Sequence, residues 1–157
     1  MSATDRTKRL AALLSKLRSA NGSDSAPAAE PAISAGGHDL IVREFVRSFL
    51  VWEAPLAKAQ SALVRIDQSC VDLNEFRVTL AEEIVEILGP GYPKVEERAE
   101  RLKAALNDIF RREHAVRLAH LAEKPKREAM KYLLSIEQTP TFVAARTLLL
   151  SLDGHSF

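Results

Sequence analysis

From His38 onward, apolar residues recur at intervals of three and four positions, and this spacing constrains the fold more than any other feature of the chain. Such a period places apolar side chains on one face of an α-helix. No stretch alternates apolar and polar residues for long enough to indicate a β-strand. The sequence therefore predicts an all-α fold, a multi-helix orthogonal bundle of roughly six to eight short helices.

Proline, glycine and capping residues mark the ends of the predicted helices. The first predicted helix ends at Pro55 and has Ile41, Phe45, Phe49 and Trp52 inward. The second runs from Pro55 to Asp67, with Leu56, Leu63 and Ile66 inward. The third starts with Asp72 and Glu75, stops at Gly89-Pro90-Gly91, and carries Phe76, Leu80, Ile84 and Leu88. The later segments are a helix with Pro93 in its first turn and Val95, Leu102, Leu106 and Ile109 inward, a short helix from His114 to Glu123, a helix from Pro125 to Ile136, and a helix from Pro140 to Leu152.

The first 37 residues differ in character from this helical region. Residues 1–19 contain five basic residues against a single acid, and their leucines share one helical face. They predict a basic amphipathic helix that binds DNA, an anionic membrane surface or a partner's groove, or that packs weakly on its own domain. Residues 20–37 consist mostly of small residues, with two prolines and three glycines, and predict a flexible linker. The predicted helical domain is residues 38–157.

The composition excludes several classes of protein. The chain is 46% apolar, which is too apolar for a wholly disordered chain, and it has no uncharged apolar run of the roughly 18–20 residues that a membrane-spanning helix needs. A single cysteine, Cys70, excludes an intramolecular disulfide framework and any site built from several thiolates. Residues 38–157 contain 17 basic and 18 acidic residues, so nucleic-acid binding would depend on a local patch. These observations predict a soluble, cytoplasmic protein.

No constellation of catalytic or metal-ligating residues stands out. His114 and His120 are six positions apart, rather than the three or four that place two ligands on one helical face. Cys70 lies in a polar turn with no neighbour that would lower the pKa of its thiol. Residues 89–91 lack the pattern of a glycine-rich phosphate loop. The sequence therefore predicts no catalytic residue, no metal site and no cofactor.

Residues 135–157 carry the clearest functional signal. Thr139 and Pro140 start a helix whose first main-chain N–H groups have no acceptor within the helix and can bind a phosphate. The basic residues in or near this segment are Lys124, Lys126, Arg127, Lys131 and Arg146. The same pattern is also typical of a buried core helix with an ordinary start, and the residues alone leave both interpretations open.

Three motifs follow one another along the helical region. They are Phe-Leu-Val-Trp-Glu-Ala at residues 49–54, Leu-Gly-Pro-Gly-Tyr-Pro-Lys-Val at residues 88–95, and Ile-Glu-Gln-Thr-Pro-Thr-Phe-Val-Ala at residues 136–144. Their order and spacing resemble those of the helix-hairpin-helix DNA glycosylases, the family of endonuclease III. That family has a Ser-Ala-Gln-like motif, an Ile-Gly, aromatic, Lys-Ala motif and the hairpin Leu-Pro-Gly-Val-Gly-Arg-Lys-Thr-Ala in these places. The likeness spans residues 40–157 and implies the fold of the helical domain of endonuclease III.

The chain departs from this family at the residues that carry the chemistry. Gln138 and Pro140 stand at the two hairpin glycines, and Pro140 has no N–H to offer a DNA phosphate. Phe142 stands where the family's lyases have the lysine that attacks the sugar, and a phenyl ring cannot form a Schiff base. The family's catalytic aspartate and its cysteine cluster lie beyond the position reached by Phe157. The resemblance therefore implies a degenerate site without glycosylase or lyase activity.

These observations predict a non-catalytic, DNA-binding relative of the base-excision-repair glycosylases, located on the nucleoid if it binds DNA. The candidate contacts to the backbone of duplex DNA are Thr139, Thr141, Lys131, Arg146 and Lys94, and the degenerate hairpin consists of Gln138, Thr139, Pro140 and Phe142. A second hypothesis is a helical protein-interaction module that keeps the scaffold without binding DNA. Its apolar surface for a partner protein, a second copy or the N-terminal helix would be Leu148, Leu149, Leu150, Leu152 and Phe157. A third hypothesis is a fragment of an active DNA glycosylase whose aspartate follows Phe157.

Overall fold

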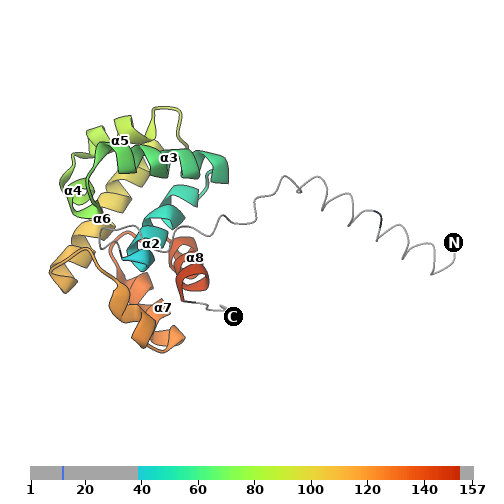
Figure 1. The fold of residues 1–157 in the computed structure, drawn as a ribbon, viewed down its shortest axis with the longest axis vertical. Coiled ribbons are helices and arrows are strands. Elements are labelled where there is room, and N and C mark those ends of the chain that lie inside the picture. The colour runs from blue at the N-terminus through green and yellow to red at the C-terminus, as the bar shows by residue number, and fades with distance from the viewer. Residues whose placement is uncertain (1–11, 13–38, 153–157) are drawn as a thin grey trace. The chain divides into compact units, whose positions relative to one another are not determined.

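A computed structural model describes residue 12 and residues 39–152 of the chain (Figure 1). The chain separates into two units, Met1–Gly37 and His38–Phe157. The predicted basic helix at residues 1–19 and the predicted linker at residues 20–37 lie outside the described residues, apart from Ala12, which is helical. The turn at residues 153–157, including Phe157, also lies outside them.

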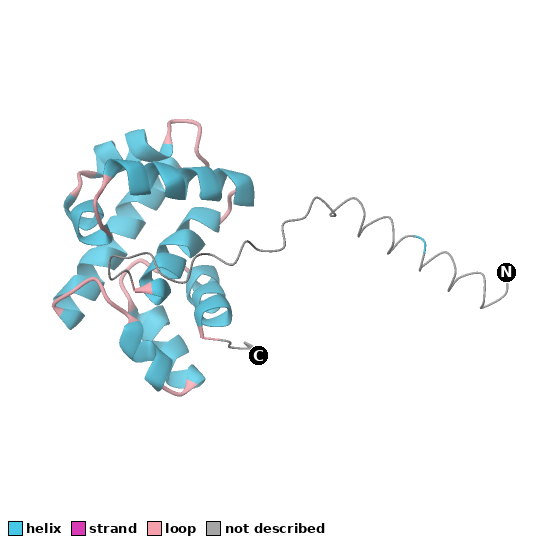
Figure 2. Ribbon diagram, viewed as in Figure 1, coloured by secondary structure: helices cyan, strands magenta, loops and turns pink. Residues whose placement is uncertain are grey.

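Between residues 39 and 152 the chain forms helices joined by short connections, and no β-strand occurs in this range (Figure 2). In chain order the elements are α2 (Leu40–Val51), α3 (Leu56–Ser69), α4 (Leu73–Val78), α5 (Ala81–Leu88), α6 (Val95–Glu113), the 3₁₀ helix η1 (Ala119–Glu123), α7 (Lys126–Ser135) and α8 (Thr141–Ser151). The expected all-α fold is confirmed for this part of the chain.

The central helix of the bundle is α2, which packs against α3, α6, α8 and η1 (Figure 1). Phe45 and Phe49 are fully buried on it, and their ring centroids lie 5.3 Å apart in a T-shaped arrangement. Asp39 starts the helix, because one of its carboxylate oxygens accepts hydrogen bonds from the N–H groups of Ile41 and Val42, at 2.9 and 3.2 Å. Its other oxygen accepts from the N–H of Leu118 and so ties the segment before η1 to the start of α2.

The single helix predicted from Asp72 to Leu88 is wrong, because Thr79 and Leu80 interrupt it with extended backbone. The Glu83 carboxylate accepts a hydrogen bond from the N–H of Leu80 at 3.1 Å and thereby caps α5. Lys103 of α6 donates to the carbonyl of Thr79 at 2.6 Å. These bonds satisfy main-chain groups that the break exposes, and the Leu80 side chain, expected in the core, is 58% exposed.

The α3 helix presents a different face to the core from the one expected. Leu56 was expected inward, but it is 49% exposed. The residues of α3 that are fully buried are Ala59, Ala62 and, nearly so, Ile66. Small residues at two of these three positions allow α3 to approach its neighbours closely. The spacing of the larger apolar residues therefore misplaced the buried stripe by part of a turn.

Both ends of α6 also differ from the expectation. Lys94 has a left-handed backbone conformation, with φ at 49°, so the helix begins at Val95 and Pro93 lies outside its first turn. At the other end His114 is left-handed as well, with φ at 55°, and it ends the helix. The helix expected at residues 114–123 is therefore reduced to the 3₁₀ turn η1, because the chain leaves α6 in irregular backbone.

Arg98 of α6 is fully buried and closes the C-terminal end of α2. Its guanidinium donates to the carbonyl of Phe49, to that of Trp52 at 2.6 Å and to that of Pro93 at 3.0 Å. Carbonyls in the last turn of a helix have no partner within the helix, and Arg98 supplies one from a neighbouring element. Burial lowers the pKa of Arg98, but a guanidinium stays charged at any pH at which the protein folds.

Candidate nucleic-acid interface

The segment that the sequence predicts to be a hairpin consists of α7, a five-residue turn and α8. Ile136 follows α7 and is buried, with 2% of its surface exposed. The N–H of Thr139 donates to the carbonyl of Ile136 at 3.2 Å, and Gln138 between them has a left-handed backbone with φ at 60°. Pro140 is extended and directly precedes α8. The turn between α7 and α8 therefore passes through a left-handed residue that is not glycine.

The strained conformation of Gln138 gives a testable consequence. A residue with a Cβ atom pays roughly 1 kcal/mol or more in the left-handed region, whereas glycine does not. We expect Gln138→Gly to raise the free energy of unfolding by about 0.5–1 kcal/mol, after allowing for the greater freedom of glycine in the unfolded chain. Urea denaturation followed by circular dichroism measures this change. Gln138→Ala keeps the Cβ atom and serves as the control, for which no gain is expected.

Asp108 of α6 holds this turn in place. Its side chain is 9% exposed, accepts a hydrogen bond from the N–H of Glu137 at 3.0 Å, and forms ion pairs with Arg111 and Arg112 at 3.0 and 2.7 Å. Arg112 also donates to the carbonyl of Ser135 at 2.6 Å, the last residue of α7. The hairpin is therefore attached to α6 through charged groups rather than through apolar contact alone.

The pKa of Asp108 makes this attachment sensitive to acid. Burial by itself would raise the pKa, but the Glu137 N–H, Arg112 and Arg111 outweigh burial, and the pKa of Asp108 is lowered. A carboxyl group with a lowered pKa stabilises the folded state above its unfolded pKa of about 4, and this contribution disappears as the pH falls through the folded value. We expect Asp108→Asn to lower the free energy of unfolding by about 2 kcal/mol at neutral pH.

The difference in the free energy of unfolding between wild type and Asp108→Asn should become smaller as the pH is lowered below about 4. Denaturation curves from pH 7 to pH 3 measure it. Asp67→Asn is the control, because Asp67 is half exposed and its ion pair with Arg43 at the surface contributes little. A constant difference between wild type and Asp108→Asn across this range would contradict the role assigned to Asp108.

The face of α7 that points away from the core carries unpaired cations. Arg127 and Lys131 are exposed and lie one turn apart, and Lys124 precedes the helix. Within the described residues, no ion pair or hydrogen bond joins their charged groups to another side chain or carbonyl. Between residues 124 and 131 the chain has four basic residues and one acidic residue. The near-neutral domain therefore has a local basic surface on α7.

The α8 helix starts next to this surface without a cap. Pro140 provides no side-chain hydrogen bond, and the first N–H groups with acceptors are those of Val143 and Ala144, which donate to the carbonyl of Pro140. The N–H groups of Thr141 and Phe142 are left for an external acceptor, as is typical of a helix N-terminus. Both side chains are exposed. The hydroxyl of Thr139 is buried and has no hydrogen-bond partner in this part of the chain.

The structure brings together most of the predicted site residues but not all of them. Gln138, Thr139, Pro140, Thr141 and Phe142 lie in the turn and the first turn of α8, and Lys131 lies one turn before the end of α7. The remaining two candidates lie elsewhere, since Arg146 contacts α2 and Lys94 pairs with Glu53.

Arg146 lies on the side of α8 that faces α2. Its guanidinium donates to the Glu44 carboxylate and to the Ser48 hydroxyl, at 3.2 Å for the latter, and its side chain is only 18% exposed. The Thr147 hydroxyl, fully buried, donates to the carbonyl of Val143. Arg146 is therefore part of a polar network between the first and last described helices, and its charge is already neutralised.

Lys94 lies at the start of α6, near Trp52 rather than near the hairpin. It forms an ion pair with Glu53, and this bond raises the pKa of Lys94. The guanidinium of Arg101 also lies near Trp52, 5.2 Å from the centroid of its ring. Sequence reasoning missed this grouping of cations around an indole ring, because it depends on the packing of α6 against the end of α2. The only sequence signal is the spacing of one and two helical turns from Lys94 to Arg98 and Arg101.

The described residues offer little for covalent chemistry. Burial raises the pKa of the Cys70 thiol, and nearby carboxylates raise it further, so the thiolate needed for nucleophilic attack is disfavoured. Within residue 12 and residues 39–152, no three His, Cys, Asp or Glu side chains are grouped to hold a metal ion. In the same range no helix combines the length and the apolar character needed to cross a bilayer. Phe142, at the start of α8, is 45% exposed.

Comparison with protein-family models gives no match, and comparison with curated protein sequences gives none either. The resemblance to the endonuclease III family thus stays a prediction from the motifs. The hairpin and the basic face of α7 are the features on which a functional proposal can be built.

Proposed function

We propose that the α7–α8 hairpin binds the phosphate backbone of duplex DNA without cleaving it. One observation carries the proposal, namely that the unpaired cations Lys124, Arg127 and Lys131 lead along α7 toward the uncapped N-terminus of α8. Main-chain N–H groups at a helix start and exposed basic side chains are the groups that proteins use to hold phosphates. None of them reads base edges, so the proposed binding is independent of sequence.

The proposed binding is weak and sensitive to salt. Only a few cations face the DNA, and the domain as a whole has no excess of positive charge. Each neutralised phosphate releases a counterion, so log K falls with log salt with a slope of about −0.9 for each phosphate contact. Because Phe142 cannot form a Schiff base, an abasic site in the duplex should neither be cleaved nor trapped.

Fluorescence anisotropy of a labelled duplex, with and without an abasic site, tests this proposal over a series of salt concentrations. The wild-type chain is expected to bind both duplexes equally at low salt. Lys131→Gln is expected to weaken binding and to reduce the steepness of the salt dependence by about one contact. Lys58→Gln is the matched control, because Lys58 lies on α3 at the opposite end of the domain from α7 (Figure 1).

Three results would overturn the proposal. They are an absence of duplex binding at low salt, equal losses for Lys131→Gln and Lys58→Gln, and covalent trapping of an abasic duplex by borohydride. The first two would remove the hairpin from DNA binding, and the third would restore the lyase hypothesis with a nucleophile other than residue 142.

A second candidate function is self-association through the outer face of α8. Phe142, Leu149 and Leu150 are 45%, 45% and 53% exposed, and Leu134 of α7 is 44% exposed. Exposed apolar side chains gathered on one helix favour an interface with another molecule, here a second copy. Sedimentation velocity over a concentration series is expected to show association that Leu149→Glu abolishes. A monomer at all concentrations, with no binding of an apolar dye, would contradict this function.

A further inference from the structure

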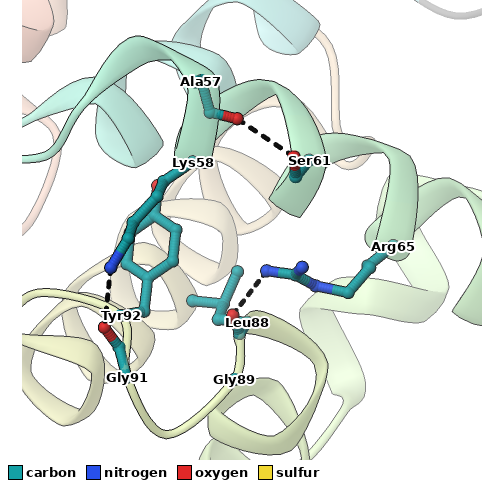
Figure 3. A pocket seen from close by; sticks show the side chains of 8 residues that line it. All are labelled: Ala57, Lys58, Ser61, Arg65, Leu88, Gly89, Gly91 and Tyr92. Carbon is teal, nitrogen blue, oxygen red and sulfur yellow. Dashed lines mark hydrogen bonds between the residues drawn. The ribbon is translucent and has the colours of Figure 1, made fainter.

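A depression of about 390 Å³ lies between α3 and the loop that joins α5 to α6, away from the proposed DNA surface. Figure 3 shows it from close by, with α3 on one side and the glycine loop on the other. The lining residues that matter here are Ala57, Lys58, Arg65, Leu88, Gly91 and Tyr92. Tyr92 is fixed in place, since its hydroxyl donates to the carbonyl of Leu50 at 2.6 Å. The depression thus has a rigid apolar floor.

Two cations reach across this depression from α3. Lys58 donates to the carbonyl of Gly91 at 3.1 Å, and Arg65 donates to the carbonyl of Leu88 at 2.6 Å (Figure 3). Arg65 also donates to the carbonyl of Ile87 at 2.8 Å. Each keeps further N–H donors, because an ammonium has three and a guanidinium has five. Within residues 39–152, neither group forms an ion pair with a carboxylate. An acidic group on a ligand can therefore bind here without displacing an internal partner.

The two glycines of the loop differ in what the fold requires of them. Gly89 has φ at +93°, a conformation that strains any residue with a side chain. Gly91 has no such φ, and a Cβ atom added to it would meet no other atom within 4 Å. Internal packing therefore does not require glycine at position 91. The missing side chain leaves the mouth of the depression open.

A second depression, of about 460 Å³, adjoins the first and shares Arg65 with it. Its wall contains Glu83 and Glu86 of α5 and Gln68 near the end of α3. The charge of the surface thus changes from basic at Lys58 of α3 to acidic at Glu83 and Glu86 of α5, and Arg65 lines both depressions. Lys58 and Gln68 are ten positions apart on one helix, which is a distance of about 15 Å.

We propose that this groove along α3 binds an extended segment of a partner protein that carries an acidic, an apolar and a basic residue in alternate positions. Enclosed cavities are typical of small-molecule sites, whereas both depressions here are open to solvent, as expected for a surface that takes side chains of a peptide. Alternate residues of an extended chain point to the same side, and five residues span roughly 13–17 Å. The acidic side chain pairs with Lys58, the apolar one packs on the exposed Ala57 beside Tyr92, and the basic one pairs with Glu86.

Fluorescence polarisation with a labelled peptide, Gly-Ser-Glu-Ser-Phe-Ser-Lys-Ser-Gly, tests this proposal on the full chain. Saturable binding is expected. A peptide with serine in place of its phenylalanine is expected to bind about tenfold more weakly, as is a peptide with glutamine in place of both charged residues. Gly91→Leu fills the mouth of the depression and is expected to reduce binding to the same degree. Its circular dichroism and melting temperature should match those of wild type, because a Cβ atom at this position meets no other atom within 4 Å and the backbone there does not require glycine.

Lys58→Glu reverses the charge of an exposed side chain and provides a second variant, which leaves the sequence of the loop unchanged but removes the hydrogen bond to the Gly91 carbonyl. It is expected to bind the peptide about tenfold more weakly, and Lys131→Gln is expected to bind it as wild type does. The proposal is overturned if no saturable binding occurs at millimolar peptide, or if Lys58→Glu binds the peptide as well as wild type. DNA binding by the same variants is measured separately, so the proposal for this groove and the proposal for the α7–α8 hairpin are tested independently of each other.

Discussion

Replacing Arg98 with methionine is expected to lower the free energy of unfolding by about 3–4 kcal/mol, the largest loss expected from a single change in this domain. Arg98 is fully buried, and its guanidinium holds carbonyls of Phe49, Trp52 and Pro93. Methionine fills a similar volume but donates no hydrogen bond. Each buried carbonyl left without a donor costs roughly 1–3 kcal/mol, and the relief of burying a charge offsets part of that sum.

Urea denaturation followed by far-ultraviolet circular dichroism measures this loss, and two variants make it specific. Arg98→Lys is expected to fall between wild type and Arg98→Met, because an ammonium is compact and cannot reach three separate carbonyls as a guanidinium does. Arg101→Met is the control, since Arg101 also lies over Trp52 but is partly exposed and pairs with Glu97 at the surface. A loss of similar size for Arg101→Met would show that the contact with Trp52, rather than the closure of α2, carries the effect.

The second large effect is expected from Glu44 and Arg146, which form an ion pair between α2 and α8. Both side chains are more than four-fifths buried, at 17% and 18% exposed. Removing one partner leaves the other charge in an environment poor in water, although Glu44 keeps Arg47 as a partner at 3.9 Å. Arg146→Met is therefore expected to lower the free energy of unfolding by about 2 kcal/mol, and Glu44→Met by about 2–3 kcal/mol. The double variant is expected to lie within about 1 kcal/mol of wild type, because two methionines pack together across the helix interface.

A double-mutant cycle by chemical denaturation measures the coupling, which is expected to be about 2 kcal/mol or more. The pair Arg43 and Asp67 is the control, because it joins α2 to α3 at the surface and is expected to show a coupling of about 0.5 kcal/mol. If the loss of stability in the double variant equals the sum of the losses in the two single variants, the two side chains are not coupled and the role assigned to the ion pair is wrong. The same Arg146→Met protein, studied below its melting temperature, is expected to bind duplex DNA as wild type does, since Arg146 faces α2.

The helices were predictable because their signals are local. Phe45 and Phe49 share a face at a spacing of four, Asp72 is followed three residues later by Glu75, and Gly89 ends α5 with a positive φ. The break at Leu80 was missed because Leu80 continues the spacing between Phe76 and Ile84. The hydrogen bond at the break, which the N–H of Leu80 donates to the Glu83 carboxylate, is equally local. A glutamate beside another glutamate, however, is also typical of an exposed helix face.

The candidate site was predictable only in part, for a related reason. The turn between α7 and α8 follows from Thr139 and Pro140 in the sequence. The roles of Arg98 and Arg146 depend on partners 49 and 102 positions away, and no pattern within one helix specifies them. A lone arginine in an amphipathic helix is usually solvated. Burial of its charge can therefore be recognised only when the position of the neighbouring helix that supplies its partners is known. The groove along α3 likewise requires the α5–α6 loop to be folded against it.

The packing of α2 against α8 determines when the domain can form during its synthesis. The two helices are separated by about a hundred residues, so closing this contact costs roughly 4 kcal/mol of chain entropy. Until the ribosome has produced α8, the face of α2 that α8 covers is open to water and to other nascent chains. Ser48 and Glu44 have no partner from α8 during that interval. We therefore expect the bundle to form only after α8 has been made and in one cooperative step, with α2 among the last helices of residues 39–152 to acquire its full set of neighbours.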